Sequence, residues 1–264
     1  MAEVSAPQPA ATLLLVRQGA SLEVLMVKRH HEIDFASGAL VFPGGKVHAD
    51  DMDAGWTELV DEPAGLDAET RALRIAGLRE AFEESGILLA RLNHNGPFAP
   101  PAALETLHAK REAIAAGKES FKAAIEEAGL ILALDALARF AHWITPEGVG
   151  RRYDTHFYIA VAPDDQVEAC DGSETVEAVW LEPGAALADA KTGKWQIVFP
   201  TRLNVEMLDQ SKHVDHAMDA ARNRTIVTVT PKIIAEDGAR ILIIPAEAGY
   251  SVTREPFVSL QRAP

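Results

Sequence analysis

The sequence contains one cysteine, Cys170, so it cannot form a disulfide within the chain. A lone cysteine is typical of a reducing compartment, and we expect a cytoplasmic protein. The sequence also lacks any run of about 18 apolar residues, so no membrane-spanning helix or membrane partner is expected. Residues 1–18 have no basic stretch followed by an apolar core, and we expect residues 1–10 to be a disordered lead-in.

Basic residues are scarce relative to acidic ones. Lys and Arg number 25 against 39 Asp and Glu, which gives a formal net charge of −14. A surface of this sign repels polyphosphate backbones, so we expect no nucleic-acid partner. A small anionic substrate remains compatible, because bound metal ions can invert the charge of a site. The sequence leaves open whether the protein is a monomer or a homodimer.

No linker, repeat or low-complexity block divides the 264 residues, and 48% of them are hydrophobic. We therefore predict a single α/β domain over residues 1–264 with one substantial core. Apolar runs predict strands at residues 12–17, 23–28, 153–161, 175–181, 225–229 and 241–244. Helical spacing predicts helices at residues 67–89, at 101–130 with a break near Gly117, and at about 201–221. Residues 50–65 are rich in acidic residues, Gly and Pro, which indicates a surface loop.

The segment at residues 79–87, REAFEESGI, is the most informative part of the chain. On a helix, Glu80, Glu83 and Glu84 stand at i, i+3 and i+4, which places their carboxylates within about 6 Å on one face. Such a cluster favours hard cations that prefer carboxylate oxygen, namely Mg²⁺ or Mn²⁺. The alternative is a solvated acidic face without an ion. In either case we expect the cluster at the surface, where losing an ion costs little stability.

The neighbours of the acidic cluster favour the metal site. Arg79 directly precedes the first glutamate, and Gly86 ends the acidic turn. Upstream, the sequence Phe42-Pro43-Gly44-Gly45 predicts a turn whose glycines let the backbone approach the same ion.

The pattern from Arg79 to Ile87, preceded by Gly45, resembles the Nudix box. The resemblance implies an α/β/α sandwich around a mixed β-sheet, here with extra helices. It also implies that Glu80, Glu83, Glu84 and the carbonyl of Gly45 bind metal. The reaction implied is attack of a metal-activated water on a pyrophosphate phosphorus. Arg79 would orient a box glutamate by a charge-assisted contact.

The box departs from the family pattern in two ways. Gly45 and Arg79 lie 34 positions apart (79 − 45), many more than in the usual box, so residues 46–70 contain an insertion. Arg71 stands where the family has a further glutamate, and Asp67 is expected to cap the helix instead of replacing that group. The proton acceptor stays open between a box glutamate and a later carboxylate, Glu174 or Glu177.

An insertion at this place resembles the coenzyme A and acyl-CoA diphosphatases. The likeness extends over most of residues 12–182, including residues 35–39, Asp50-Asp51, 143–146 and 151–157. The substrate-binding residues that it implies are Arg29, Gly38, Phe42, Arg151 and Arg152. In a related CoA signature, Val27 and Asp34 replace a threonine and an arginine.

Three functions therefore remain in view. The first is hydrolysis of CoA or acyl-CoA, and the second is the same chemistry on ADP-ribose or NADH. The third is a nucleotide-binding Nudix protein without turnover, which the intact glutamate triad disfavours. His30 and His31 are less suited to a shared ion than to a substrate contact, because adjacent residues of a strand face opposite ways. Trp143 is expected in the core or in a pocket wall and not as a stacking platform.

Overall fold

The computed structural model describes residues 5–29, 38–170 and 175–257. Its main sheet has the strand order β10-β2-β1-β9-β8-β11, with β3 paired to β2 and β4 paired to β1. The strands are β1 (Gln8–Gln18), β2 (Leu22–Arg29), β3 (Leu40–Val41), β4 (Gly44–Lys46), β8 (Ala138–Ile144), β9 (Tyr153–Val161), β10 (Thr175–Leu181) and β11 (Thr228–Val229). The sheet is mixed, because β1 runs parallel to β9 and antiparallel to β2.

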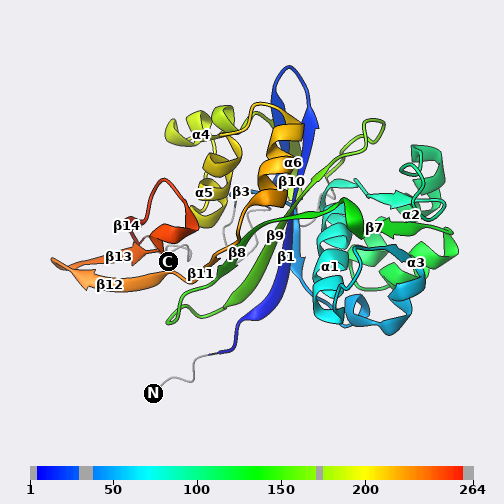
Figure 1. The fold of residues 1–264 in the computed structure, drawn as a ribbon, viewed down its shortest axis with the longest axis horizontal. Helices are drawn as coiled ribbons and strands as arrows, with labels where there is room; N and C mark the ends of the chain where they lie inside the picture. The colour runs from blue at the N-terminus through cyan, green and yellow to red at the C-terminus, as the bar shows by residue number, and fades with distance from the viewer. Residues whose placement is uncertain (1–4, 30–37, 171–174, 258–264) are drawn as a thin grey trace.

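Helices cover both faces of this sheet. On one side lie α1 (Ala68–Ser85), α2 (Pro101–Ala115) and α3 (Phe121–Glu127), and on the other lie α4 (Pro183–Lys191), α5 (Phe199–Leu208) and α6 (Val214–Asn223) (Figure 1). The central strand β1 is apolar on both faces, with Leu13 and Leu15 in one buried cluster and Leu14 and Val16 in the other. A continuous apolar run is what a strand covered on both sides requires. The expected α/β/α sandwich is confirmed.

The helix that carries the acidic cluster, α1, begins as its sequence predicts but ends at Ser85, before the predicted end at residue 89. The Asp67 carboxylate caps it by accepting a hydrogen bond from the Thr70 amide at 2.7 Å. Gly86 ends it at φ 78°, a left-handed conformation that suits glycine. The expectation that its acidic face lies at the surface is wrong, since every residue from 72 to 85 is buried. The helix lies between the sheet and the segment formed by α2 and α3.

The insertion at residues 46–70 is not the open surface loop that its composition suggests. It contains two 3₁₀ turns, η1 (Asp50–Met52) and η2 (Ala54–Glu58), and the short strand β5 (Val60–Asp61). Trp56 is fully buried and Asp51 is 2% exposed. Strand β5 pairs with β7 (Ile131–Ala133), which also pairs with β6 (Ala90–Arg91). The insertion is therefore packed onto α1 and the helical segment, where a side chain can reach the box.

Two further expectations need correction. Residues 8–10 are not disordered, because they begin β1 and pair in parallel with β9 from Gln8 onward. The helix expected at residues 201–221 is two helices, α5 and α6, separated by residues 209–213. The predicted break near Gly117 is confirmed, since it separates α2 from α3.

Beyond the sandwich, β12 (Lys232–Glu236), β13 (Ala239–Ile243) and β14 (Arg254–Pro256) form a small antiparallel sheet. Two 3₁₀ turns complete the elements, η3 (Leu134–Ala136) and η4 (Ala246–Ala248). Among the described residues, no helix combines the length and the apolar character needed to cross a membrane.

Candidate functional site

The three glutamates of the acidic cluster lie in the last two turns of α1, facing the glycine turn before and within β4. Glu80, Glu83 and Glu84 are only 7%, 9% and 3% exposed. The Glu84 carboxylate accepts a hydrogen bond from the Gly44 amide at 3.0 Å. A Cβ added at Gly45 would lie 2.5 Å from Glu80 Cδ, closer than such atoms approach. Glycine at position 45 thus lets the backbone come directly against a box carboxylate.

Arg79 holds two of the three carboxylates in place. Its Nη1 donates to Glu80 at 2.9 Å and to both oxygens of Glu83 at 3.2 and 3.3 Å. Its Nη2 donates to the Lys46 carbonyl at 2.8 Å, on the strand that carries Gly45. One guanidinium therefore connects the box helix to β4, and its planar fork fixes the carboxylate positions.

Asp51 completes this network, and it comes from the insertion. Its carboxylate accepts two hydrogen bonds from Arg79, from Nε at 2.9 Å and from Nη2 at 3.0 Å. The His48 amide donates to the same carboxylate at 2.7 Å. Asp51 appeared in the sequence only as part of the Asp50-Asp51 likeness, and no role was predicted for it. Spacing alone gave no signal, because the contact joins residues 28 positions apart through space.

The guanidinium of Arg79 stays positively charged among these carboxylates. Burial by itself would lower the pKa of the guanidinium. The hydrogen bonds that Arg79 donates to Asp51, together with the negative charges of Glu80, Asp51 and Glu83, outweigh burial and raise the pKa of the guanidinium above its ordinary value. Arg71, which replaces the family's further glutamate, plays no part here, because it pairs with Glu62 at 2.6 Å.

The C-terminal end of α1 is held by residues distant in sequence. Arg111 of α2 donates from Nε to the Glu83 carbonyl at 3.0 Å and from Nη2 to the Ala169 carbonyl at 2.7 Å. The Thr175 hydroxyl donates to the Glu84 carbonyl at 3.1 Å. Glu174 lies outside the described residues, but it directly precedes Thr175 in the sequence. Glu177 lies in β10, where it pairs with Lys28 of β2.

Three of the predicted substrate-binding residues, Arg29, Gly38 and Phe42, lie where β2 pairs with β3, with Val27 aligned to Val41 and Lys28 to Leu40. Phe42 is 3% exposed within the apolar core, and Gly38 takes a left-handed φ of 69°. Arg29 ends β2 and pairs with Thr175 in the sheet. These three retain their binding assignment only as a prediction. Residues 30–37, which include His30, His31, Asp34 and the first part of the likeness at residues 35–39, lie outside the described ranges.

The two arginines before β9 differ in their surroundings. Arg152 is 9% exposed and donates to the carbonyls of Thr145 and Ser5, each at 3.1 Å. The bond to Thr145 closes the turn between β8 and β9, and the bond to Ser5 holds the residues before β1, so both contacts are structural. Arg151 is exposed. Of the pair, Arg151 is the better placed to meet a phosphate from solvent.

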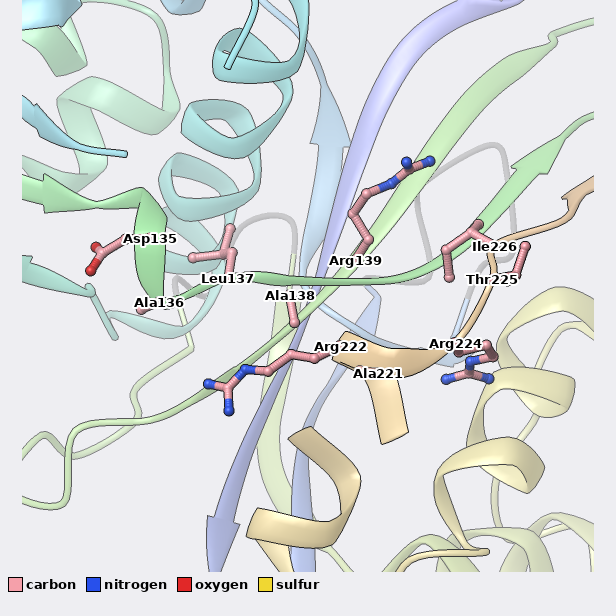
Figure 2. Close-up of a pocket in the computed structure, with 10 residues that line it drawn as sticks. All are labelled: Asp135, Ala136, Leu137, Ala138, Arg139, Ala221, Arg222, Arg224, Thr225 and Ile226. Carbon is pink, nitrogen blue, oxygen red and sulfur yellow. The ribbon is translucent and has the colours of Figure 1, made fainter. Parts of the chain in front are cut away.

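A hollow of about 540 Å³ lies away from the box, between η3, β8 and the end of α6 (Figure 2). Its lining includes Arg139, Arg222 and Arg224 but none of the box residues. The three guanidinium groups point in different directions, so they do not converge on one anion (Figure 2). We therefore place the candidate site at the box and not in this hollow.

The residues at the box suit a hard divalent cation. Three buried carboxylates from one helix, beside a backbone that approaches without a side chain, supply oxygen donors alone. Mg²⁺ and Mn²⁺ prefer such donors, whereas softer ions prefer nitrogen or sulfur.

Comparison with known proteins identifies relatives of this arrangement. A sequence model described as the NUDT19 Nudix domain matches residues 63–208. A protein named putative nudix hydrolase 7, from Caenorhabditis elegans, is 31% identical over 192 residues, 73% of this chain and 57% of the relative. Acyl-coenzyme A diphosphatase NUDT19 of Xenopus laevis is 28% identical over 211 residues, 65% of this chain and 56% of the relative. The chain thus spans a little over half the length of these curated relatives.

A solved structure supports the same likeness. A crystal structure of a NUDIX hydrolase from Alicyclobacillus acidocaldarius superposes with a TM-score of 0.68 at 27% sequence identity. The superposition covers 81% of this chain and 96% of the other.

Proposed function

The chain belongs to the Nudix family through its NUDT19 Nudix domain, and we propose that it hydrolyses the pyrophosphate bond of CoA or acyl-CoA. The observation that carries the chemistry is the buried network in which Arg79 holds Glu80 and Glu83 beside the Gly44–Gly45 turn. A protein that only bound nucleotide would not require three buried carboxylates around one helix end. Turnover is therefore favoured over binding alone.

Glu80, Glu83, Glu84 and the Gly45 carbonyl would hold Mg²⁺ or Mn²⁺. A bound ion at such a site neutralises phosphate charge and lowers the pKa of a water, so that hydroxide is available near neutral pH. The chain's own contribution is placement. Arg79 fixes two carboxylates, the Gly44 amide fixes the third, and Asp51 fixes Arg79.

The proton from the attacking water passes to a carboxylate near the box. The candidates are a box glutamate and Glu174, whose neighbour Thr175 contacts the end of α1. The later acidic candidate, Glu177, lies further along β10, where it pairs with Lys28 of β2, and is less favoured. The electrons of the broken bond go to the leaving phosphate, which the positive charges of the site stabilise.

Two observations support CoA or acyl-CoA over ADP-ribose or NADH. The Xenopus laevis relative carries the name acyl-coenzyme A diphosphatase, at 28% identity. The insertion at residues 46–70 also forms a packed wall beside the box, with Asp51 and Trp56 buried. A wall of this kind can border a long groove, which an extended pantetheine arm requires more than a compact nucleotide does.

Hydrolysis rates across a substrate panel test this assignment. We expect kcat/KM for CoA or an acyl-CoA to exceed the values for ADP-ribose, NADH and nucleoside triphosphates, with 3′,5′-ADP as one product. Faster cleavage of ADP-ribose or NADH would overturn the substrate class and leave the Nudix chemistry intact.

Dephospho-CoA, which lacks the 3′-phosphate of CoA, tests the role of Arg151. If Arg151 contacts that phosphate, Arg151→Gln should slow the hydrolysis of CoA about tenfold or more and leave the hydrolysis of dephospho-CoA unchanged. Equal effects on both would remove Arg151 from the site.

Chelation of the metal tests the burial of the box. Because the carboxylates are buried, we now expect removal of Mg²⁺ to lower Tm measurably, in contrast to the small effect expected for a surface cluster. An ion at 100 times its Kd adds about 2.7 kcal/mol, and about 2–4 °C accompanies each kcal/mol in a chain of this size. Thermal melts with EDTA and with excess Mg²⁺ should differ by roughly 5–10 °C. Unfolding by EDTA at 25 °C would instead make the ion essential to the fold.

A further inference from the structure

A second cluster of metal-binding side chains lies on β8 and β9, outside the box. It consists of His142, Asp154 and His156, whose ligand atoms all lie within 4.8 Å of one another. His142 and His156 are direct partners across the two antiparallel strands. Asp154 lies two residues before His156 and therefore projects from the same face of the sheet.

The geometry within the cluster is close to that of a metal site. His142 Nε2 lies 2.5 Å from Asp154 Oδ1, and His156 Nε2 lies 3.7 Å from the same oxygen. The two imidazole rings are stacked, with centroids 4.0 Å apart. Around a tetrahedral Zn²⁺ with bonds of about 2.0–2.2 Å, ligand atoms stand roughly 3.3 Å apart. Shifts of less than about 1 Å in the two His–Asp distances would give that spacing.

A further residue fixes the orientation of one ligand. Thr228 of β11 contacts His142 Nδ1 through its hydroxyl at 2.8 Å. Metal-bound histidines commonly use their second nitrogen in this way, which leaves Nε2 for the ion.

The protonation of the other histidine also suits a ligand. Burial, followed by the neighbouring His142, lowers the pKa of His156 to about 4. Asp154 opposes this effect, and Arg139 adds to it. His156 is therefore neutral near pH 7 and keeps a nitrogen lone pair.

The cluster is separate from the box, although both lie on the α1 side of the sheet. Ala11 of β1 aligns with Gly45 on one side and with His156 on the other. Strand spacing therefore places His156 about 10 Å from Gly45, and His142 about 14 Å away. Between them, α1 crosses β1 where a Cβ on Gly77 would lie 3.7 Å from Ala11. An ion at the histidines would not share the box carboxylates.

We propose that His142, Asp154 and His156 form a second metal site that binds Zn²⁺ or a similar transition ion. Two imidazole nitrogens and one carboxylate oxygen suit such an ion better than Mg²⁺, which prefers oxygen alone. The three side chains are 13%, 35% and 22% exposed, so water can complete the coordination. This site is independent of the proposed hydrolysis, and its ion would tie β8 to β9 at one end of the sheet.

Zn²⁺ titration of the full-length, tag-free protein tests the site. The protein would be stripped of metal, given excess Mg²⁺ to fill the box, and titrated with Zn²⁺ against a chromogenic chelator. We expect one Zn²⁺ per chain. We also expect at least about a hundredfold weaker binding in His156→Gln and in Asp154→Asn, since each removes one of three ligands.

Three controls separate this site from other histidines and from misfolding. His216→Gln on the exposed side of α6 and a variant carrying both His30→Gln and His31→Gln should bind as the unchanged protein does. Thermal melts without metal report whether each ligand variant folds. If His156→Gln does not fold, the Zn²⁺ affinity of Asp154→Asn tests the site. Absence of Zn²⁺ binding in the unchanged protein, or equal affinity in a folded ligand variant, would overturn the proposal. Because the test measures Zn²⁺ binding, its result does not depend on whether the protein hydrolyses CoA.

Discussion

Glu83→Gln and Glu84→Gln should each lower kcat by at least about a hundredfold at saturating Mg²⁺. Glutamine keeps the size of glutamate but removes the charge that an ion requires. Glu84 also accepts from the Gly44 amide, a bond that glutamine can retain through its carbonyl oxygen. The fold should therefore persist while the chemistry is lost, and steady-state kinetics on CoA at several Mg²⁺ concentrations measures this.

Glu69→Gln is the matched control. Glu69 lies in the first turn of the same helix, is exposed, and loses the same charge when substituted. Its kcat should stay within about twofold of the unchanged protein, because exposed charges far from a site act weakly. A Glu83→Gln or Glu84→Gln enzyme with near-full kcat would show that the residue is not a ligand. Circular dichroism would confirm that each variant is folded.

Asp51→Ala should lower the free energy of unfolding by about 3–5 kcal/mol, the cost of removing one partner from a buried ion pair. Asp51 is 2% exposed and binds Arg79 through two hydrogen bonds, so its loss leaves a buried guanidinium with fewer acceptors. Urea unfolding in EDTA measures the change without a contribution from bound metal. In Mg²⁺, kcat should fall as well, because Arg79 then positions Glu80 and Glu83 less firmly.

Asp53→Ala provides the comparison within the same insertion. Asp53 pairs with Lys122 at 2.6 Å, but the carboxylate is half exposed, so the pair is screened by solvent. Its substitution should cost much less stability and leave kcat unchanged. If Asp51→Ala is no more destabilising than Asp53→Ala, the buried network does not depend on Asp51. Asp51→Asn, which retains the shape of the side chain, should give an intermediate kcat.

The parts of the fold that the sequence predicts best are those set by local pattern. The strands at residues 153–161 and 175–181 coincide with β9 and β10, because each is an apolar run bounded by polar turns. The helix around Glu80 is equally local, since Asp67 caps it and Gly86 ends it. The glutamate cluster was recognisable for the same reason, because its spacing repeats the helical period.

The parts that the sequence missed depend on contacts through space. The composition of residues 50–65 indicates a loop, yet Trp56 is buried against Phe121, 65 positions later (121 − 56). Asp51 likewise gains its partner only when the insertion packs onto α1. The burial of α1 on nearly all sides was hidden too, because its charged residues are balanced by partners from other segments and not by solvent.

The parallel pairing of β1 with β9 has a consequence for how the chain folds. Gln8 aligns with Tyr153, which is 145 positions later (153 − 8), so the centre of the sheet closes only when distant segments meet. Until then, β1 has only its antiparallel partners β2 and β4, and its outer edge is exposed. Pairings of such long sequence separation slow folding, because the entropy of closing a long loop is lost before the contacts form. During synthesis, α1 emerges well before β9, the strand that completes the sheet under it. In that interval the unpaired edge of β1 is open to pairing with a wrong strand.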